Sequence, residues 1–331
     1  MRHNGTEKPS QRVLMELAEK SRNGLEFAKR TILAEKIQDV KLRDALEYYL
    51  STWNDITHPG LFATAYEAVG GDVRDAVSAQ AALAMIAAAF DIHDDIIDKS
   101  ILKHAEQTVF GRFGGEIALL LGDAFLVGGF SLFFTSIEKL GKERAAILGV
   151  MKQALYEFGN AHALELKLKK TVDAKPEECL EIIKMKAASI EGDMRIGAMI
   201  AGGTKKEIDA LAKYGRILGT LAMLREEFVD VFDIEELHQR SSSEYMPLPI
   251  LCALQDSRSA RIGIQKIIEK GITRKSIDAL IEAVFKTKTV GELKDYMQEL
   301  VTEASRLTIM VRNKEAAQQL RSYIASTLED L

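Results

Sequence analysis

The helical spacing of apolar residues along most of the chain is the feature that most restricts its fold. Segments such as DALEYYLSTW, AAILGVMKQALYEFGNAHALELKLKK and EECLEIIKMKAASIEGDMRIGAMIAGG repeat apolar residues at steps of three and four. This period is typical of amphipathic helices. Runs of alternating apolar and polar residues between turns, which would predict β-strands, are absent from the sequence. The chain is therefore predicted to be all-α.

Short breaks separate the predicted helices. They fall at HPG, VGGD, TVDAKP, AGGTKKE and SSSEYMPLP, and Thr204 precedes Glu207 as in a capping box. No break is long enough to divide domains, so residues 1–331 are predicted to form one helical bundle. Within it we expect disorder at residues 1–8, a motif-bearing core at about 40–260 and packing helices at 260–331.

Composition restricts the class of protein further. Apolar residues make up 47% of the 331 residues, which is enough for a large core. The net charge is −5, so the composition lacks the excess of basic residues that is typical of nucleic-acid-binding proteins. Cys179 and Cys252 lie far apart without metal-site spacing, so we interpret them as reduced core thiols. The start MRHNGTEKPSQRV has no apolar segment and is not a secretory signal. We expect a cytoplasmic protein.

The longest apolar run, IALLLGDAFLVGGFSLFF, could be mistaken for a membrane span. It carries Asp123 near its middle and three glycines. A span of about 20 residues would avoid that charge. The run is predicted to be a buried core helix, and no integral membrane segment is expected.

Four aspartates gather in AFDIHDDIIDKS, directly after the apolar run AALAMIAAAF. Because a helix turns about 100° per residue, Asp91, Asp94, Asp95 and Asp98 fall within about a third of its circumference. Four carboxylates beside a core need a counter-charge. Oxygen ligands without His or Cys clusters suit Mg²⁺, which often binds substrate phosphates as well. This acidic face therefore predicts a diphosphate ligand.

A second acidic face occurs in LAMLREEFVDVFDIEELHQR. Glu226, Asp230 and Asp233 stand at i, i+4 and i+7, again after an apolar helix. The two faces could oppose each other across a cavity inside a bundle, a common place for metal sites. The alternative for each face is an ordinary solvated helix end, and it applies more readily to the second face.

The acidic motif and its surroundings resemble the trans-prenyl diphosphate synthases, the polyprenyl synthetase family. HDDIID resembles the first aspartate-rich motif, DDxxD, of that family. FGGEIALLLGD, HALEL and KAASIEGDMRIGAMIAGG resemble three downstream family segments, and the last keeps Lys186. VDVFD resembles the second DDxxD, with Val229 in place of its first aspartate. The resemblance covers roughly residues 40–260.

The resemblance implies a fold, a reaction and an assembly. The fold is an isoprenoid-synthase helical bundle with a deep central cavity. An allylic diphosphate, bound through Mg²⁺ between the acidic helices, ionises, and homoallylic isopentenyl diphosphate then attacks the cation and extends the chain. Metal ions would neutralise charge on the leaving diphosphate, and the apolar cavity would shield the cation from water. Family members are commonly homodimers.

The resemblance also implies residue roles. The metal ligands would be Asp94, Asp95, Asp98, Glu226, Asp230 and Asp233. Diphosphate contacts would come from Lys103, His104 and Lys186. Ala89 and Phe90 would form a cavity floor that favours a short or medium product, although Phe90 could be an ordinary core residue. Asp91 and Glu165 could support the site from outside the ligand set, or Asp91 could simply be solvated.

One upstream segment departs from the family pattern Gly-Gly-Lys-Arg-x-Arg-Pro, whose basic residues hold isopentenyl diphosphate. Aligned on EAVGGD, this chain places Asp55 at the lysine, Ile56 at the first arginine and His58 at the second. Two arginines after the first motif are replaced by Lys103 and His104. The guanidinium group of arginine can donate two parallel hydrogen bonds to a diphosphate, whereas lysine and histidine cannot bind it in this bidentate way. The allylic site is therefore predicted to be kept and the homoallylic site to be altered.

Three functions stay open on this sequence. The chain could be a prenyltransferase whose missing charge comes from Lys103, His104, Arg225 or Arg240. It could be a terpene cyclase-like enzyme that ionises an allylic diphosphate without condensation, for which an aromatic share of 7% is modest support. It could be a non-catalytic partner subunit, against which the intact first motif argues. Chorismate-mutase-like and ferritin-like bundles are alternatives at the level of the fold only.

Overall fold

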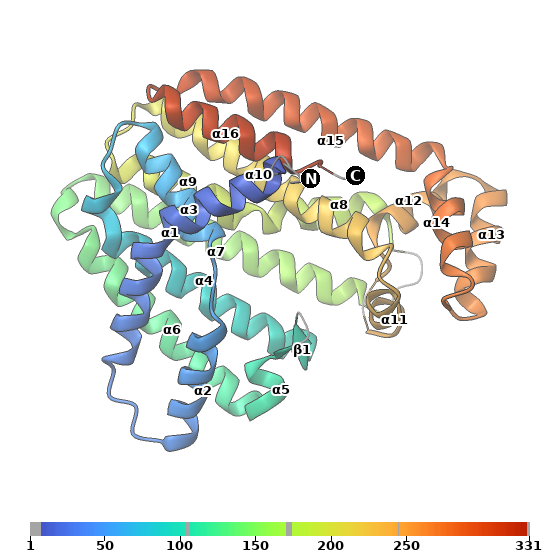
Figure 1. Ribbon diagram of the computed structural model, residues 1–331, viewed down its shortest axis with the longest axis horizontal. Coiled ribbons are helices and arrows are strands. Elements are labelled where there is room, and N and C mark those ends of the chain that lie inside the picture. The colour runs from blue at the N-terminus through green and yellow to red at the C-terminus, as the bar shows by residue number, and fades with distance from the viewer. Residues whose placement is uncertain (1–7, 104–105, 170–173, 244, 330–331) are drawn as a thin grey trace, which may run out of the picture. The chain divides into compact units, whose positions relative to one another are not determined.

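The computed structural model describes residues 8–103, 106–169, 174–243 and 245–329. The prediction of disorder at residues 1–8 therefore falls, apart from Lys8, outside the described residues, and His104 lies outside them too. The elements, in chain order (Figure 1), are α1 (Pro9–Leu33), α2 (Val40–Thr52), α3 (Thr57–Ala68), η1 (Val73–Ala76), α4 (Val77–Asp98), β1 (Leu102–Lys103), β2 (Glu106–Gln107), α5 (Val109–Phe113), α6 (Gly115–Ser136), η2 (Glu138–Leu140), α7 (Glu143–Leu168), α8 (Pro176–Lys186), α9 (Ala188–Ile200), α10 (Lys205–Asp230), α11 (Ile234–Ser243), α12 (Leu248–Asp256), α13 (Arg258–Glu269), α14 (Ile277–Phe285), α15 (Lys288–Leu307), η3 (Thr308–Met310) and α16 (Lys314–Ser326).

The all-α prediction is confirmed. In the described ranges the only sheet is the antiparallel pair β1–β2, in which Leu102 pairs with Gln107 and Lys103 with Glu106. The predicted capping box is also present at the start of α10. The Glu207 carboxylate accepts the Thr204 N–H at 2.8 Å, and the Thr204 hydroxyl accepts the Glu207 N–H at 3.4 Å.

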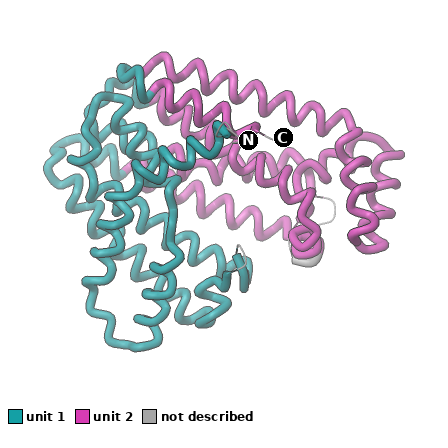
Figure 2. Tube along the Cα trace, in the orientation of Figure 1, with its two compact units in different colours: residues 1–148, 193–208, 312–316 teal, residues 149–192, 209–311, 317–331 magenta. Residues whose placement is uncertain are grey.

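The chain divides into two compact units, which Figure 2 shows in different colours. The first contains residues 1–148, 193–208 and 312–316, and the second contains residues 149–192, 209–311 and 317–331. The interpretation of the whole chain as a single domain stays a prediction.

The close packing of α4 against α6 forms the centre of the first unit. A Cβ atom added at Gly129 of α6 would lie 2.8 Å from Cγ1 of Ile86 and 3.1 Å from the carbonyl oxygen of Ala82. One added at Gly122 would lie 2.4 Å from Nε2 of His93. The two helices thus approach more closely than larger residues would allow. This packing fixes the helix that carries the first acidic motif.

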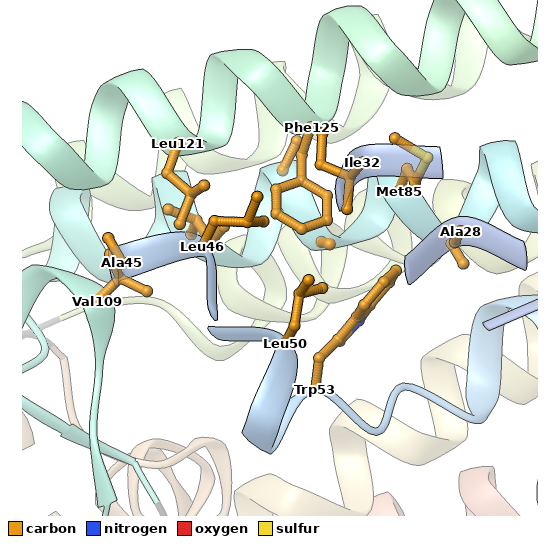
Figure 3. Close-up of a cluster of buried hydrophobic side chains, with 14 of the residues drawn as sticks. Ala28, Ile32, Ala45, Leu46, Leu50, Trp53, Met85, Val109, Leu121 and Phe125 are labelled. Carbon is orange, nitrogen blue, oxygen red and sulfur yellow. The ribbon is translucent and has the colours of Figure 1, made fainter. Parts of the chain in front are cut away.

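An aromatic cluster fixes the chain that leaves α2. Trp53, which is only 6% exposed, meets Phe125 of α6 edge-on, with ring centroids 5.5 Å apart. Tyr49 meets the same Phe125 ring at 5.2 Å, and Figure 3 shows Trp53 and Leu50 extending toward Phe125. Buried aromatic pairs of this kind contribute about 0.5–1.5 kcal/mol beyond the burial of their area. The segment just before α3 is therefore anchored beside α4 and α6.

The prediction of a buried core helix holds for only one face of α6. Leu121 and Phe125 are fully buried, whereas Leu120, Val127 and Phe134 are 52%, 69% and 42% exposed. By length and composition, the helical stretches 73–98 and 115–136 could each cross a membrane. Core helices of soluble proteins pass the same test, and the expected lack of a membrane segment stays a prediction.

Polar contacts join the long helices of the second unit. The guanidinium group of Arg216 on α10 donates to Glu157 of α7 and to Glu191 of α9, each at 2.6 Å. The hydroxyl of buried Tyr214 donates to the carbonyl oxygen of Leu320 on α16 at 2.6 Å. These contacts hold α10, whose last turn carries part of the second acidic face. Both cysteines of the chain are free, as predicted.

Candidate active site

The first acidic face lies at the C-terminal end of α4, in the first unit. Asp91, Asp94, Asp95 and Asp98 are all half-buried there. The helix ends at Asp98, and the next residue, Lys99, caps it with a left-handed φ of 56°. Carboxylates in the last turns of a helix lie close to the negative end of its dipole, which disfavours their charge. A cation bound at this position would therefore stabilise the charged forms of these carboxylates.

The pKa of Asp95 is raised, in part by this excess of negative charge. Burial raises it to about 7; Lys103 lowers it, and Asp91, Asp94 and Asp98 raise it further. Lys103, on β1, forms an ion pair with Asp91. The structure thus brings Lys103 to the acidic face as predicted, but a single lysine only partly offsets four carboxylates.

The upstream segment that departs from the family pattern lies near the same face. Oδ1 of Asp55 accepts the N–H groups of Thr57 and His58 at 2.9 and 3.3 Å, and so caps α3. Nδ1 of His58 lies 2.6 Å from Oδ2 of Asp193, which is 6% exposed. The positive charge of His58 is therefore already matched by a carboxylate, and the start of α3 is occupied by another.

The same carboxylates shift the pKa values of His58 and Tyr49. Burial disfavours the charged form of His58, but Asp193, Asp55 and Asp91 together raise its pKa to about 9. Burial, Asp91 and Asp55 also raise the pKa of Tyr49 at the end of α2. The first acidic face, the end of α2 and the start of α3 thus form one polar site within the first unit.

The second acidic face, in the second unit, is less uniform than its sequence spacing predicts. The side chain of Glu226 is 65% exposed and lies 3.5 Å from Arg225. Asp233 caps α11, because its Oδ1 accepts the N–H groups of Glu235 and Glu236 at 2.9 and 3.1 Å. Among the described residues, no three His, Cys, Asp or Glu side chains already form a group that could hold a metal ion.

Asp230 is the half-buried member of the second face. It forms an ion pair with Arg240 of α11, and the same guanidinium group donates to Glu227 at 3.0 Å and to Glu236 at 3.2 Å. Burial raises the pKa of Asp230 to about 7, against the effect of Arg240. This part of the face is therefore a carboxylate cluster built around one arginine.

Glu227, which is only 7% exposed, was not among the residues predicted from the sequence. Its carboxylate accepts from Arg240 and from the Leu248 N–H, the latter at 2.6 Å. The available signal was periodicity, because Glu227 follows Leu224 by three residues and so falls on the buried face of α10. A carboxylate at a core position needs partners, and Arg240 is one of them.

The remaining predicted residues fall into two groups. Lys186 and Glu165 form an ion pair, and the Tyr245 hydroxyl donates to Glu165 at 3.3 Å. The structure therefore brings these two predicted residues together. Ala89 is fully buried in the core cluster of the first unit, and Phe90 beside it is half-buried.

Comparison with known proteins identifies the family. Residues 39–287 match the sequence model of the polyprenyl synthetase family. The chain is 31% identical over 229 residues to a short chain isoprenyl diphosphate synthase of Methanothermobacter thermautotrophicus, covering 67% of this chain and 69% of the relative. It is 28% identical over 283 residues to the octaprenyl diphosphate synthase of Escherichia coli, covering 83% and 85%. The chain belongs to the polyprenyl synthetase family.

Solved structures agree on the fold. A geranylgeranyl pyrophosphate synthetase from Pyrococcus horikoshii superposes with a TM-score of 0.82 at 19% identity, covering 98% of this chain and 100% of the other. A polyprenyl synthase from Caulobacter crescentus, complexed with calcium and isoprenyl diphosphate, superposes with a TM-score of 0.79 at 19% identity, covering 99% and 98%. The predicted isoprenoid-synthase type of helical fold is thus confirmed.

Proposed function

We propose that this chain is a prenyltransferase that elongates an allylic prenyl diphosphate with isopentenyl diphosphate. The observation behind this proposal is the first acidic face, whose clustered carboxylates favour a bound cation. The chain that carries this face belongs to the polyprenyl synthetase family. The named relatives are prenyl diphosphate synthases of several product lengths. The Caulobacter synthase, solved with a divalent cation and an isoprenyl diphosphate, supports the same class of ligand.

The donor atoms of the first face suit Mg²⁺ by their chemistry, although among the described residues they too do not already form a group of three that could hold the ion. Asp94, Asp95 and Asp98 offer only oxygen ligands, and their mutual repulsion and position at a helix end favour a hard cation. When bound, Mg²⁺ would neutralise charge on the departing diphosphate. In the second unit, Asp230, Asp233 and Glu226 are proposed for the same task. Asp230 would have to share its charge between the metal and Arg240.

The lysines complete the proposed diphosphate site. Lys103 and Lys186 are each held by a carboxylate, Asp91 and Glu165 respectively. These pairings restrict the two long side chains, so that less conformational entropy is lost when a phosphate binds. His104 is proposed for the same role. Ala89 and Phe90 are proposed to limit product length.

The capped start of α3 favours a second candidate function. Asp55 and the His58–Asp193 pair stand where the family resemblance predicts cations for isopentenyl diphosphate. A terpene cyclase-like enzyme, which ionises an allylic diphosphate without a second substrate, has no need of those cations. A non-catalytic partner subunit would use neither diphosphate.

One incubation separates these functions. Farnesyl diphosphate and Mg²⁺ are supplied with and without labelled isopentenyl diphosphate, and all products are identified by mass. Longer labelled diphosphates are expected if the proposal is right. Release of diphosphate with hydrocarbon or alcohol products, equal in both tubes, would instead establish the cyclase-like function. No turnover in either tube would favour the partner subunit.

We also propose a cytoplasmic homodimer that uses the exposed face of α6. Leu120, Val127 and Phe134 recur at intervals of seven residues and form one apolar stripe. A contiguous exposed apolar stripe of this kind is typical of an interface between protein chains. A second copy of the chain would cover it with an identical stripe.

A further inference from the structure

A strongly basic segment lies at the edge of the second unit, on α13 and the loop that follows it (Figure 1). Residues 257–276 contain six basic residues and one acidic residue, Glu269, in a chain whose net charge is −5. We call the six the basic edge. All are exposed: Arg258, Arg261, Lys266, Lys270, Arg274 and Lys275.

Helix α13 combines this charge with an exposed apolar residue. Ile264 is fully buried, on the side where α13 packs against α12 and α14. On the opposite side, Arg258, Ile262 and Lys266 follow one another at intervals of four residues and share one face. Ile262 is 57% exposed between the two cations. The outer face of α13 therefore presents both positive charge and apolar surface to solvent.

The loop after α13 is held by hydrogen bonds. Nε2 of His238 on α11 lies 2.6 Å from the carbonyl oxygen of Ile272, and the Thr273 N–H donates to the Ser276 hydroxyl at 2.9 Å. Arg274 and Lys275 are thus presented from a fixed backbone next to α13. None of the six cations belongs to the diphosphate site proposed above.

We propose that the basic edge docks the protein on the surface of an anionic phospholipid bilayer. Lysines and arginines near such a surface each contribute about 1 kcal/mol, or about fivefold in affinity. Ile262 would enter the boundary between headgroups and acyl chains, as the apolar residues of interfacial helices do. Residues 257–276 contain no Phe, Tyr or Trp on which nucleic-acid bases could stack, so charge and apolar exposure together favour lipid over nucleic acid.

The test is sedimentation of the full-length protein with lipid vesicles. One set contains phosphatidylcholine alone and the other contains phosphatidylglycerol as well, each at low and high salt. We expect binding to the anionic vesicles only, and weaker binding at high salt. Equal binding to both sets, or no binding to the anionic set, would overturn the proposal. So would tighter binding to single-stranded RNA than to the anionic vesicles at the same salt.

Matched variants locate the surface. The edge variant replaces four of the six cations with Ser, at Arg258, Lys266, Lys270 and Lys275. The control variant makes the same change of charge at four exposed lysines elsewhere, Lys139, Lys142, Lys205 and Lys206. The edge variant should lose at least about a hundredfold in vesicle affinity, and the control less than about tenfold. Equal losses would show that only net charge matters and would overturn the assignment of the surface.

Two further measurements check that the variants are folded. Circular dichroism and prenyltransferase activity without vesicles should match the wild type in both variants, because the substituted side chains are exposed and lie outside the proposed active site. If the edge variant does not fold, the single substitution Lys266→Glu replaces it. It reverses one charge and is expected to weaken vesicle binding by about tenfold or more. An unchanged affinity for that folded variant would contradict the proposal.

Discussion

Asp95 is the single residue on which the proposed reaction most depends. The substitution Asp95→Asn keeps the size of the side chain but removes a charge from the proposed metal site. We expect kcat to fall by about a hundredfold or more and the Mg²⁺ concentration for half-maximal activity to rise. Asp44→Asn, at an exposed carboxylate on α2, is the control and should stay within about fivefold of wild type. Steady-state assays across a Mg²⁺ series would show both effects, and wild-type activity in Asp95→Asn would exclude the assignment.

The His58–Asp193 pair predicts a pH dependence of stability. The pKa of His58 rises from 6.5 to about 9 on folding, so the folded protein binds more protons than the unfolded chain between these values. The contribution of this pair to the free energy of unfolding should therefore be fully present at or below pH 6.5 and be lost as pH rises to 9. The loss is on the order of 3 kcal/mol, since each pKa unit corresponds to about 1.36 kcal/mol. Urea unfolding at several pH values should show a flatter profile for His58→Gln and for Asp193→Asn, and an unchanged slope would contradict the prediction.

Sequence spacing predicted some of the site residues and could not predict others. Asp91, Asp94, Asp95 and Asp98 share a face because one helix carries them all, and that follows from the period alone. The pairing of His58 with Asp193 joins residues 135 positions apart. No local pattern specifies such a contact, since it depends on how α3 packs against α9. The Arg240–Asp230 pair likewise depends on the turn between α10 and α11.

At the scale of helices, the close approach of α4 and α6 can be tested with one methyl group. Gly129→Ala would place a Cβ atom 2.8 Å from Ile86 and should lower the free energy of unfolding by about 1–3 kcal/mol. Gly149 of α7 has nothing within 4 Å of an added Cβ atom, so Gly149→Ala should stabilise by about 0.5–1 kcal/mol. Denaturant unfolding of both variants measures this contrast. A stabilising Gly129→Ala would mean that helix propensity, rather than packing, governs Gly129.

The helices themselves were predictable, but the buried face of α6 was not. Apolar residues surround this helix, so its sequence has little contrast between a core side and a solvent side. α13 shows more contrast, because Ile264, Ile267 and Ile268 recur at steps of three and four and mark its core side, while charged residues surround them. The β1–β2 pair escaped prediction because two residues a strand are too few to show alternation.

At the scale of the whole molecule, the proposed dimer makes a prediction about mass in solution. Val127→Asp places a charge in the centre of the apolar stripe on α6, where Val127 is 69% exposed. We expect the dimer to dissociate into monomers, because an unpaired carboxylate would be buried at the interface. Val40→Asp is the matched control, since Val40 is also 69% exposed but lies at the start of α2. Light scattering after size-exclusion chromatography measures both variants, and a dimeric Val127→Asp would rule out this interface.

The fold of the whole chain followed from its motifs more readily than from its periodicity. Helical spacing alone also allowed other helical bundles, whereas HDDIID and FGGEIALLLGD together pointed to one family. The division into two compact units had no signal in the sequence. The breaks between helices are all short. Most unit boundaries fall within helices such as α7 and α10, and the one between residues 311 and 312 falls in the short connection before α16.

The buried position of Trp53 supplies a built-in optical probe. It is the only tryptophan in the chain, and it belongs to the first unit. Its fluorescence should move to longer wavelength when that unit unfolds and water reaches the indole, while far-UV ellipticity follows the helices of both units. We expect the two signals to change at the same denaturant concentration, as they do for a cooperative domain. Separate midpoints would mean that the enzyme can lose one half of its bundle while the other stays folded.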